Sequence, residues 1–103
     1  MIEITAIRKD GKIRNLTVKG HANSAPIGHD LVCAAVSSVV TGGLNALSNP
    51  DCFAIKMEKG NVEVNEKKHA NEHDYDVLET VLTQLKTVEE TDSKFVKVIE
   101  KGN

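Results

Sequence analysis

Polar and apolar residues alternate along the first part of the chain, and a turn signal interrupts this alternation once. The segment MIEITAIR has a period of two, which is typical of a strand with one buried face. KDGK at 9–12 is a turn signal, and IRNLTVKG at 13–20 resumes extended structure. Residues 2–20 are therefore predicted to form a β-hairpin.

A long apolar run follows in the middle of the chain. LVCAAVSSVVTGGLNALS at 31–48 is apolar nearly all round, which predicts a buried helix. Gly42 and Gly43 either weaken this helix near its third turn or let another backbone come close. SNPD at 48–51 then ends the helix.

The second half repeats the pattern and adds a final strand. CFAIKME at 52–58 and VEVN at 62–65, joined by a KGN turn, predict a second hairpin. Apolar residues at helical spacing predict an amphipathic helix over about 72–88. KFVKVIEK at 94–101 alternates again and predicts a closing strand. The order ββαββαβ indicates an α+β fold, a mostly antiparallel sheet packed with two helices as an α/β sandwich.

Composition narrows the class of protein. A chain of 103 residues without a linker suits a single domain over 1–103. The net charge of -2 and the 3% aromatic content give no basic, aromatic surface, so we expect no direct nucleic-acid binding. The first residues contain no signal peptide or membrane span, which predicts a cytoplasmic protein with no membrane contact. In a reducing compartment Cys33 and Cys52 are expected to be thiols rather than a disulfide.

The residues that could take part in catalysis or bind a metal lie close together in KGHANSAPIGHDLVCAAVSS at 19–38. His21 follows the second strand, and Cys33 lies in the first turn of the next helix. Asp30 is a good N-cap whose carboxylate can accept from the amide of Cys33. The sulfur then lies at the positive end of the helix dipole, which stabilises a thiolate, and a nearby histidine would stabilise it further. The same N–H groups could hold an oxyanion.

Spacing alone leaves three interpretations of these residues. A buried cysteine, a capping aspartate and a surface histidine are all common, so spacing favours a structural role over a Cys–His nucleophile or a metal site. His21, His29, Asp30 and Cys33 are possible metal ligands. However, the stretch has no C-x-x-C or H-x-x-x-H pairing, and adjacent His29 and Asp30 would need a sharp turn to reach one ion. We therefore expect no metal and no cofactor.

A longer sequence pattern favours the Cys–His nucleophile over a structural role or a metal site. GHA at 20–22, a five-residue gap and GHDLVCAAVS at 28–37 resemble the signature of the ribosomal-processing cysteine protease family, Prp. That signature runs Gly-His-Ala, a short loop, then Gly-x-Asp-aliphatic-aliphatic-Cys-small-small-aliphatic-Ser. Chain length and element order fit the family over the whole chain. The loop departs from it: NSAPI, with Pro26, stands where the family often has glycine and tyrosine, so a stiffer loop is expected.

The resemblance implies a specific activity. The family removes a short N-terminal extension from the bacterial large-subunit ribosomal protein numbered twenty-seven, cutting after a phenylalanine pair and before a small residue and a basic segment. Carried onto this sequence, Cys33 is the nucleophile that forms an acyl-enzyme, and His21 is its base. Asp30 either orients His21 or caps the helix, and we favour the cap with a contact to basic substrate residues. Ser37 lies one turn beyond Cys33, and its expected role is a hydrogen bond back to the carbonyl of Cys33.

The resemblance also bears on motion and assembly. The loop is expected to be a mobile lid over the substrate, with hinge freedom at Gly20 and Gly28; its members are Ala22, Asn23, Ser24, Ala25, Pro26, Ile27 and Gly28. The family implies a homodimer and a peptide partner, the N-terminal segment of the ribosomal precursor.

The other cysteine and the other histidines have ordinary structural roles, and two other functions remain open. Cys52 is expected in the core, and His69 and His73 in a solvated polar segment. A non-catalytic ribosome-assembly binding module is the main alternative function, and a thiol or metal sensor is the third.

Overall fold

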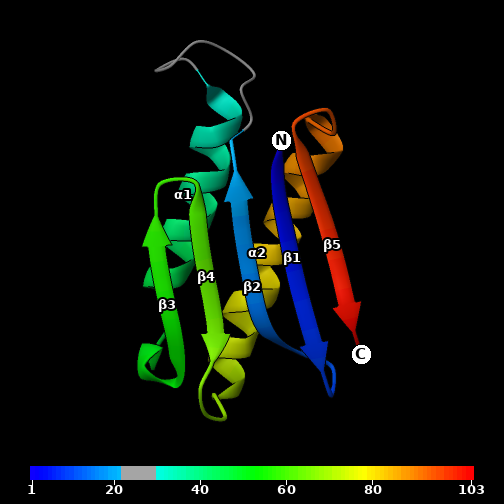
Figure 1. Ribbon diagram of the computed structural model, residues 1–103. Coiled ribbons are helices and arrows are strands. Elements are labelled where there is room, and N and C mark those ends of the chain that lie inside the picture. Colours follow the sequence, from blue (N-terminus) through cyan, green and yellow to red (C-terminus); the bar gives the residue numbers. More distant parts are fainter. Residues whose placement is uncertain (22–29) are drawn as a thin grey trace.

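Five strands form one sheet, and two helices cover one of its faces (Figure 1). The computed structural model describes residues 1–21 and 30–103. The predicted order ββαββαβ and the α+β class are confirmed. The elements are β1 (Ile2–Lys9), β2 (Lys12–Gly20), α1 (Leu31–Asn45), β3 (Phe53–Glu58), β4 (Asn61–Glu66), α2 (Glu72–Thr91) and β5 (Val96–Gly102), with a short 3-10 helix, η1 (Pro50–Cys52), before β3.

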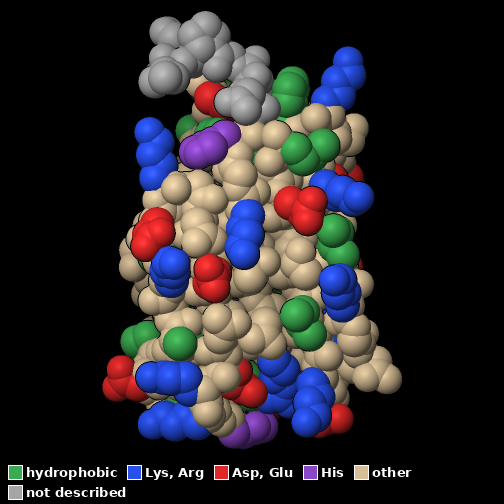
Figure 2. Space-filling view, in the orientation of Figure 1, with side chains coloured by type: hydrophobic (Ala, Val, Ile, Leu, Met, Phe, Trp, Pro, Cys, Tyr) green, Lys and Arg blue, Asp and Glu red, His purple; other side chains and the backbone are tan. Residues whose placement is uncertain are grey.

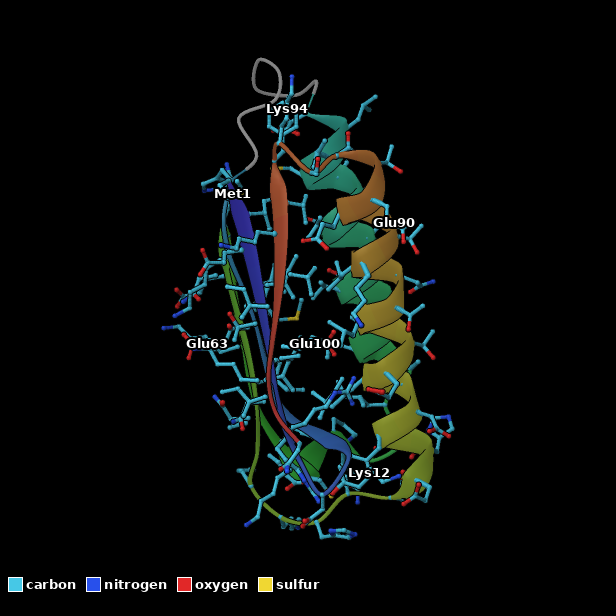
Figure 3. The ribbon with its side chains drawn as sticks, turned by 90° about the vertical axis from the view of Figure 1, so that its right-hand side faces the viewer. Met1, Lys12, Glu63, Glu90, Lys94 and Glu100 are labelled. Carbon is cyan, nitrogen blue, oxygen red and sulfur yellow. The ribbon has the colours of Figure 1, made fainter. Side chains whose placement is uncertain are left out.

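The strand order places the two hairpins side by side. The sheet runs β3-β4-β2-β1-β5, so β2 and β4 join the hairpins in the middle. The β3–β4, β4–β2 and β2–β1 pairings are antiparallel, whereas β5 runs parallel to β1 at the edge. Figure 3 shows both helices in one layer, to one side of the sheet. Described residues include no helix that is both long and apolar enough to cross a membrane.

The core lies between the sheet and the helix layer. The period-two pattern of β1 directs Ile2, Ile4 and Ala6 toward the helices, and each is nearly inaccessible to solvent. The apolar stripe predicted for α2 is confirmed, because Leu78, Val81, Leu82 and Leu85 are all buried. Burial of such aliphatic side chains is the main stabilising term for a chain with so few aromatics.

The prediction of a buried first helix is wrong. Only one stripe of α1 is buried, at Val32, Val36, Val40 and Leu44. Leu31 is 81% exposed. The sheet has a single layer of helices, so α1 packs on one side only, and apart from Leu31 its outer positions are mostly small or polar residues that tolerate water.

Several predicted boundaries move by a few residues. The first helix ends at Asn45 rather than at 48, and the second continues to Thr91 rather than stopping near 88. The closing strand begins at Val96, because Phe95 and Val96 both donate their N–H groups to the carbonyl of Asp92 in a tight turn. Alternation along KFVKVIEK cannot distinguish that turn from a strand.

The other face of the sheet has no helix over it and carries mixed charges. Figure 2 looks onto this face, where basic and acidic side chains are interspersed. Glu3 of β1 has Lys19 of β2 and Lys97 of β5 as its register partners. Opposite charges on neighbouring strands stabilise a sheet modestly and keep a solvated face soluble.

The two helices pack closely at Gly43, where the group in contact is a side chain and not the backbone that the glycine pair was predicted to admit. A Cβ built at Gly43 would lie 2.1 Å from Cγ2 of Val81 on α2, whereas one built at Gly42 would meet nothing within 4 Å. Gly43 therefore permits the packing of α1 on α2, and Gly42 faces open space.

We expect Gly43→Ala to destabilise the protein by about 1–3 kcal/mol, because the added methyl group would force the helices apart. Gly42→Ala is the matched control and should stabilise by roughly 0.5–1 kcal/mol, since alanine favours the helix. Urea denaturation of both variants measures the difference. Equal effects of the two substitutions would contradict a close contact at Gly43.

A buried carboxylate ties the start of α2 to the segment that follows α1. Asp74 is 0% exposed. Its oxygens accept from the N–H and hydroxyl of Ser48 at 2.8 and 2.9 Å and from the N–H of Asn49 at 2.8 Å. Burial by itself raises the pKa of Asp74, but the hydrogen bonds from His73, Ser48 and Asn49 outweigh it and lower the pKa to about 2.

Candidate active site

Three segments meet at one end of the sheet and form a pocket. They are the end of β2, the turn between β3 and β4, and the start of α1, all at the upper end in Figure 1. The pocket has a volume of about 320 Å³. Its described lining is Ile2, Val18, Gly20, His21, Cys33, Val36, Ser37, Val40, Thr41, Met57, Glu58, Lys59, Gly60, Asn61 and Val62.

Cys33 enters the pocket from the first turn of α1. The predicted N-cap is confirmed: the N–H of Cys33 donates to Oδ1 of Asp30 at 3.0 Å. The backbone carbonyl of Asp30 accepts a hydrogen bond from the N–H of Ala34, so both the side chain and the backbone of Asp30 hold the first turn. The Cys33 side chain is partly buried and forms no disulfide. A sulfur in this position lies at the positive end of the helix dipole.

His21 enters the pocket directly after β2, and its backbone is held by two neighbours. Its carbonyl accepts a hydrogen bond from the nitrogen of Met1 at 2.6 Å. The preceding residue, Gly20, donates its N–H to the carbonyl of Gly60 at 3.0 Å. Gly20 has φ +101, and a Cβ there would lie 2.3 Å from the carbonyl oxygen of Met1, so only glycine fits.

The structure brings His21 and Cys33 to the same pocket although they lie on different elements. Ser37, one turn further along α1, also lines it and is exposed. The predicted lid, residues 22–28, and His29 lie outside the described residues.

Several lining residues carry no signal in the sequence. Met57, Gly60 and Val62 come from the second hairpin, which was expected only to complete the sheet. They reach the pocket because β4 pairs with β2, where Val62 is the register partner of Val18. Only the pairing of strands far apart in the chain could have revealed them.

The other cysteine and the other two histidines in the described part of the chain lie away from the pocket. Cys52 is 4% exposed within the core, as predicted. His69 and His73 are both exposed, also as predicted. Within residues 1–21 and 30–103, no three His, Cys, Asp or Glu side chains group closely enough to hold a metal ion.

A cysteine at a helix N-terminus that shares an apolar pocket with a histidine is the arrangement of a thiol hydrolase. The sequence model of the family described as cysteine protease Prp matches residues 1–97. The chain therefore belongs to the Prp family of cysteine proteases.

Curated relatives agree with this assignment. The chain is 31% identical over 94 residues to the ribosomal processing cysteine protease Prp of Staphylococcus aureus, a match that covers 86% of this chain and 87% of the relative. It is 48% identical over 48 residues to the protein of the same name from Bacillus subtilis, covering 46% of this chain and 43% of the relative.

Solved structures share the fold over nearly the whole chain. The S. aureus protease Prp with a covalently linked product peptide has a TM-score of 0.88 and 28% identity, covering 98% of this chain and 100% of that one. The same protease with a substrate peptide has a TM-score of 0.82 and 27% identity, with the same coverage. The SMU.848 protein of Streptococcus mutans has a TM-score of 0.84 and 28% identity, covering 100% of this chain and 96% of that one.

Proposed function

We propose that this protein removes the short N-terminal extension of the bacterial large-subunit ribosomal protein numbered twenty-seven, through an acyl-enzyme on Cys33. The observation that carries the proposal is that Cys33 and His21 line one pocket, with Cys33 in the first turn of α1. The named S. aureus and B. subtilis relatives are ribosomal processing proteases, and the S. aureus enzyme has been seen with a covalently linked product peptide.

Each half of the reaction has a proton route through His21. The imidazole takes the proton of the Cys33 thiol as the sulfur attacks the scissile carbonyl. The C–N bond breaks, the leaving amine takes that proton from the imidazolium, and the released segment departs with a new N-terminus. Water then gives a proton to His21 and attacks the thioester, which frees the carboxylate of the extension and returns the proton to the sulfur.

The oxyanion formed in each half needs donors. The N–H of Cys33 donates to the carboxylate of Asp30, so other backbone N–H groups must hold the negative charge of the oxyanion. We assign this role to the N–H groups of Leu31 and Val32, which precede Cys33 in the first turn, where an α-helix forms no internal hydrogen bonds through its N–H groups.

The pocket suits an apolar residue before the cut. Its apolar lining comes from both layers of the fold, from Ile2, Val18, Val36, Val40, Met57 and Val62. A phenylalanine side chain would bury its ring against these aliphatic groups, which favours binding by roughly 25 cal/mol per Å² of apolar surface removed from water. This chemistry agrees with a cut after a phenylalanine pair.

A synthetic peptide that spans the extension and the first mature residues tests the proposal. We expect one cut after the phenylalanine pair, with a transient increase in the protein mass equal to the acyl fragment. A peptide with aspartate in place of the phenylalanine before the cut is the control and should remain intact. No cleavage of the first peptide, or equal cleavage of both, would contradict the proposal. Mass spectrometry reads all three outcomes.

Two further properties stay predictions. The family resemblance implies a homodimer in solution, and the sequence predicts a cytoplasmic location. Light scattering after size-exclusion chromatography measures the first.

A further inference from the structure

The turn between β3 and β4 touches the histidine of the pocket at a single glycine. Gly60 has φ +75, a conformation that favours glycine. A Cβ built on Gly60 would lie 2.7 Å from Nε2 and 3.0 Å from Cε1 of His21. The imidazole therefore rests against the backbone of Gly60, in the space that any other side chain would fill.

A second contact fixes the turn relative to the strand that carries the histidine. The carbonyl of Gly60 accepts the N–H of Gly20 at 3.0 Å, and Gly20 immediately precedes His21. The β2–β4 pairing continues up to Lys19 and Asn61, one residue short of this bond. The surface on which the ring rests is thus attached to the same backbone that presents the ring.

We propose that Gly60 is a positioning residue: its lack of a side chain keeps the His21 imidazole against the β3–β4 turn, in the pocket that Cys33 also lines. This rests on the proposed function, in which His21 is the base. His21 is exposed, so a methyl group at position 60 would not be trapped in a core but would push the ring aside. A displacement of about 1 Å at a catalytic group can cost about 100-fold in rate.

The chain offers a matched control in its other hairpin. Gly11 has φ +76, almost the same as Gly60, but a Cβ there would meet nothing within 4 Å. Alanine at either position carries the same backbone strain, whereas only alanine at position 60 contacts the imidazole. The difference between Gly60→Ala and Gly11→Ala therefore isolates the contact with His21.

Peptide cleavage and thermal melting of the two variants test the proposal. We expect similar melting temperatures for Gly60→Ala and Gly11→Ala, because the displaced ring can move into solvent. We expect kcat to fall about 10- to 100-fold in Gly60→Ala with little change in KM, and to stay at the wild-type value in Gly11→Ala.

A double-variant cycle separates positioning from a general structural effect. In a His21→Ala background, adding Gly60→Ala should lower kcat no further, because no ring remains to be displaced. The rate at which iodoacetamide alkylates Cys33 gives a second readout that needs no substrate. It is measured with Cys52→Ala present, so that a single thiol reacts, and it should fall in Gly60→Ala and be unchanged in Gly11→Ala.

The outcomes distinguish the two proposals. Equal kcat values in Gly60→Ala and Gly11→Ala, together with a large loss in His21→Ala, would overturn the positioning role alone. A wild-type kcat in His21→Ala would overturn both the catalytic assignment of His21 and the positioning role. A further loss from Gly60→Ala in the His21→Ala background would show that the turn acts through another group and would also overturn the proposal.

Discussion

Replacing Cys33 by alanine is expected to abolish peptide cleavage, with a loss of at least about 1000-fold in kcat. The sulfur is the only group in the proposed reaction that forms a covalent bond to the substrate, and neither His21 nor the helix N-terminus can substitute for it. Because Cys33 is only partly buried, the smaller alanine should leave the fold intact. Cleavage assays and circular dichroism on the same preparation measure both effects.

The second cysteine is the matched control. Cys52 lies in the core at the end of η1, outside the pocket lining, so Cys52→Ala should lower stability slightly and leave kcat unchanged. Cys33→Ser should still bind the peptide without turnover and thus capture the complex. Processing by Cys33→Ala at the wild-type rate would exclude the protease mechanism. An inactive wild-type chain that binds the peptide as tightly as Cys33→Ala does would support the binding-module alternative.

The largest effect on stability is expected at Asp74, which takes no part in the reaction. Asp74→Asn keeps the shape of the side chain but replaces one of its two acceptor oxygens by an N–H₂ group, which then faces the N–H of either Ser48 or Asn49. Buried donors left without an acceptor are costly, so we expect a loss of about 2–4 kcal/mol. That is a large part of the roughly 5–15 kcal/mol that holds a small domain folded. Asp76→Asn, an exposed carboxylate on the same helix, is the control and should change stability little.

The pH dependence gives a second measurement of the same carboxylate. The pKa of Asp74 is about 2 in the folded protein, against an ordinary value of 3.8. Between these values the unfolded chain binds the proton and the folded protein does not, so stability is present above pH 3.8 and is lost as the pH falls toward 2. The span corresponds to roughly 2 kcal/mol. Glu66, Glu72 and Glu100 also have lowered pKa values, so the contribution of Asp74 is the difference between the wild-type and Asp74→Asn acid titrations. Identical acid titrations would contradict this assignment.

The local features of the fold could be predicted from the sequence because they depend on neighbouring residues. Alternation in β1, the apolar stripe of α2 and the cap of α1 by Asp30 each involve positions at most a few residues apart. The exposure of α1 could not be predicted in this way. Apart from Leu31, the outer positions of α1 are mostly Ala, Ser, Thr and Gly, which occur on buried and on exposed helix faces, so the number of layers decides how much of this helix is buried.

The same distinction separates the parts of the site. Histidine and cysteine are common in structural roles, and His21 and Cys33 stood out because they are part of a long sequence pattern. Gly60 did not, because a glycine in a KGN turn has an ordinary explanation. Asp74 was hidden within KKHANEHD, a segment expected to be solvated throughout. Its burial depends on Ser48 and Asn49, which lie more than 20 positions earlier in the chain.

The pocket lies at one end of the fold, beside the start of α1 (Figure 1). Asp74 and its partners Ser48 and Asn49 lie at the opposite end, because the end of α1 leads into Ser48 and Asn49. A library of variants scored by cleavage in a crude lysate would therefore mix two kinds of defect. Substitutions near Asp74 reduce the number of folded molecules, whereas substitutions near Cys33 reduce the turnover of each molecule. Dividing the measured activity by the amount of soluble protein would sort the variants by the end of the molecule that they alter.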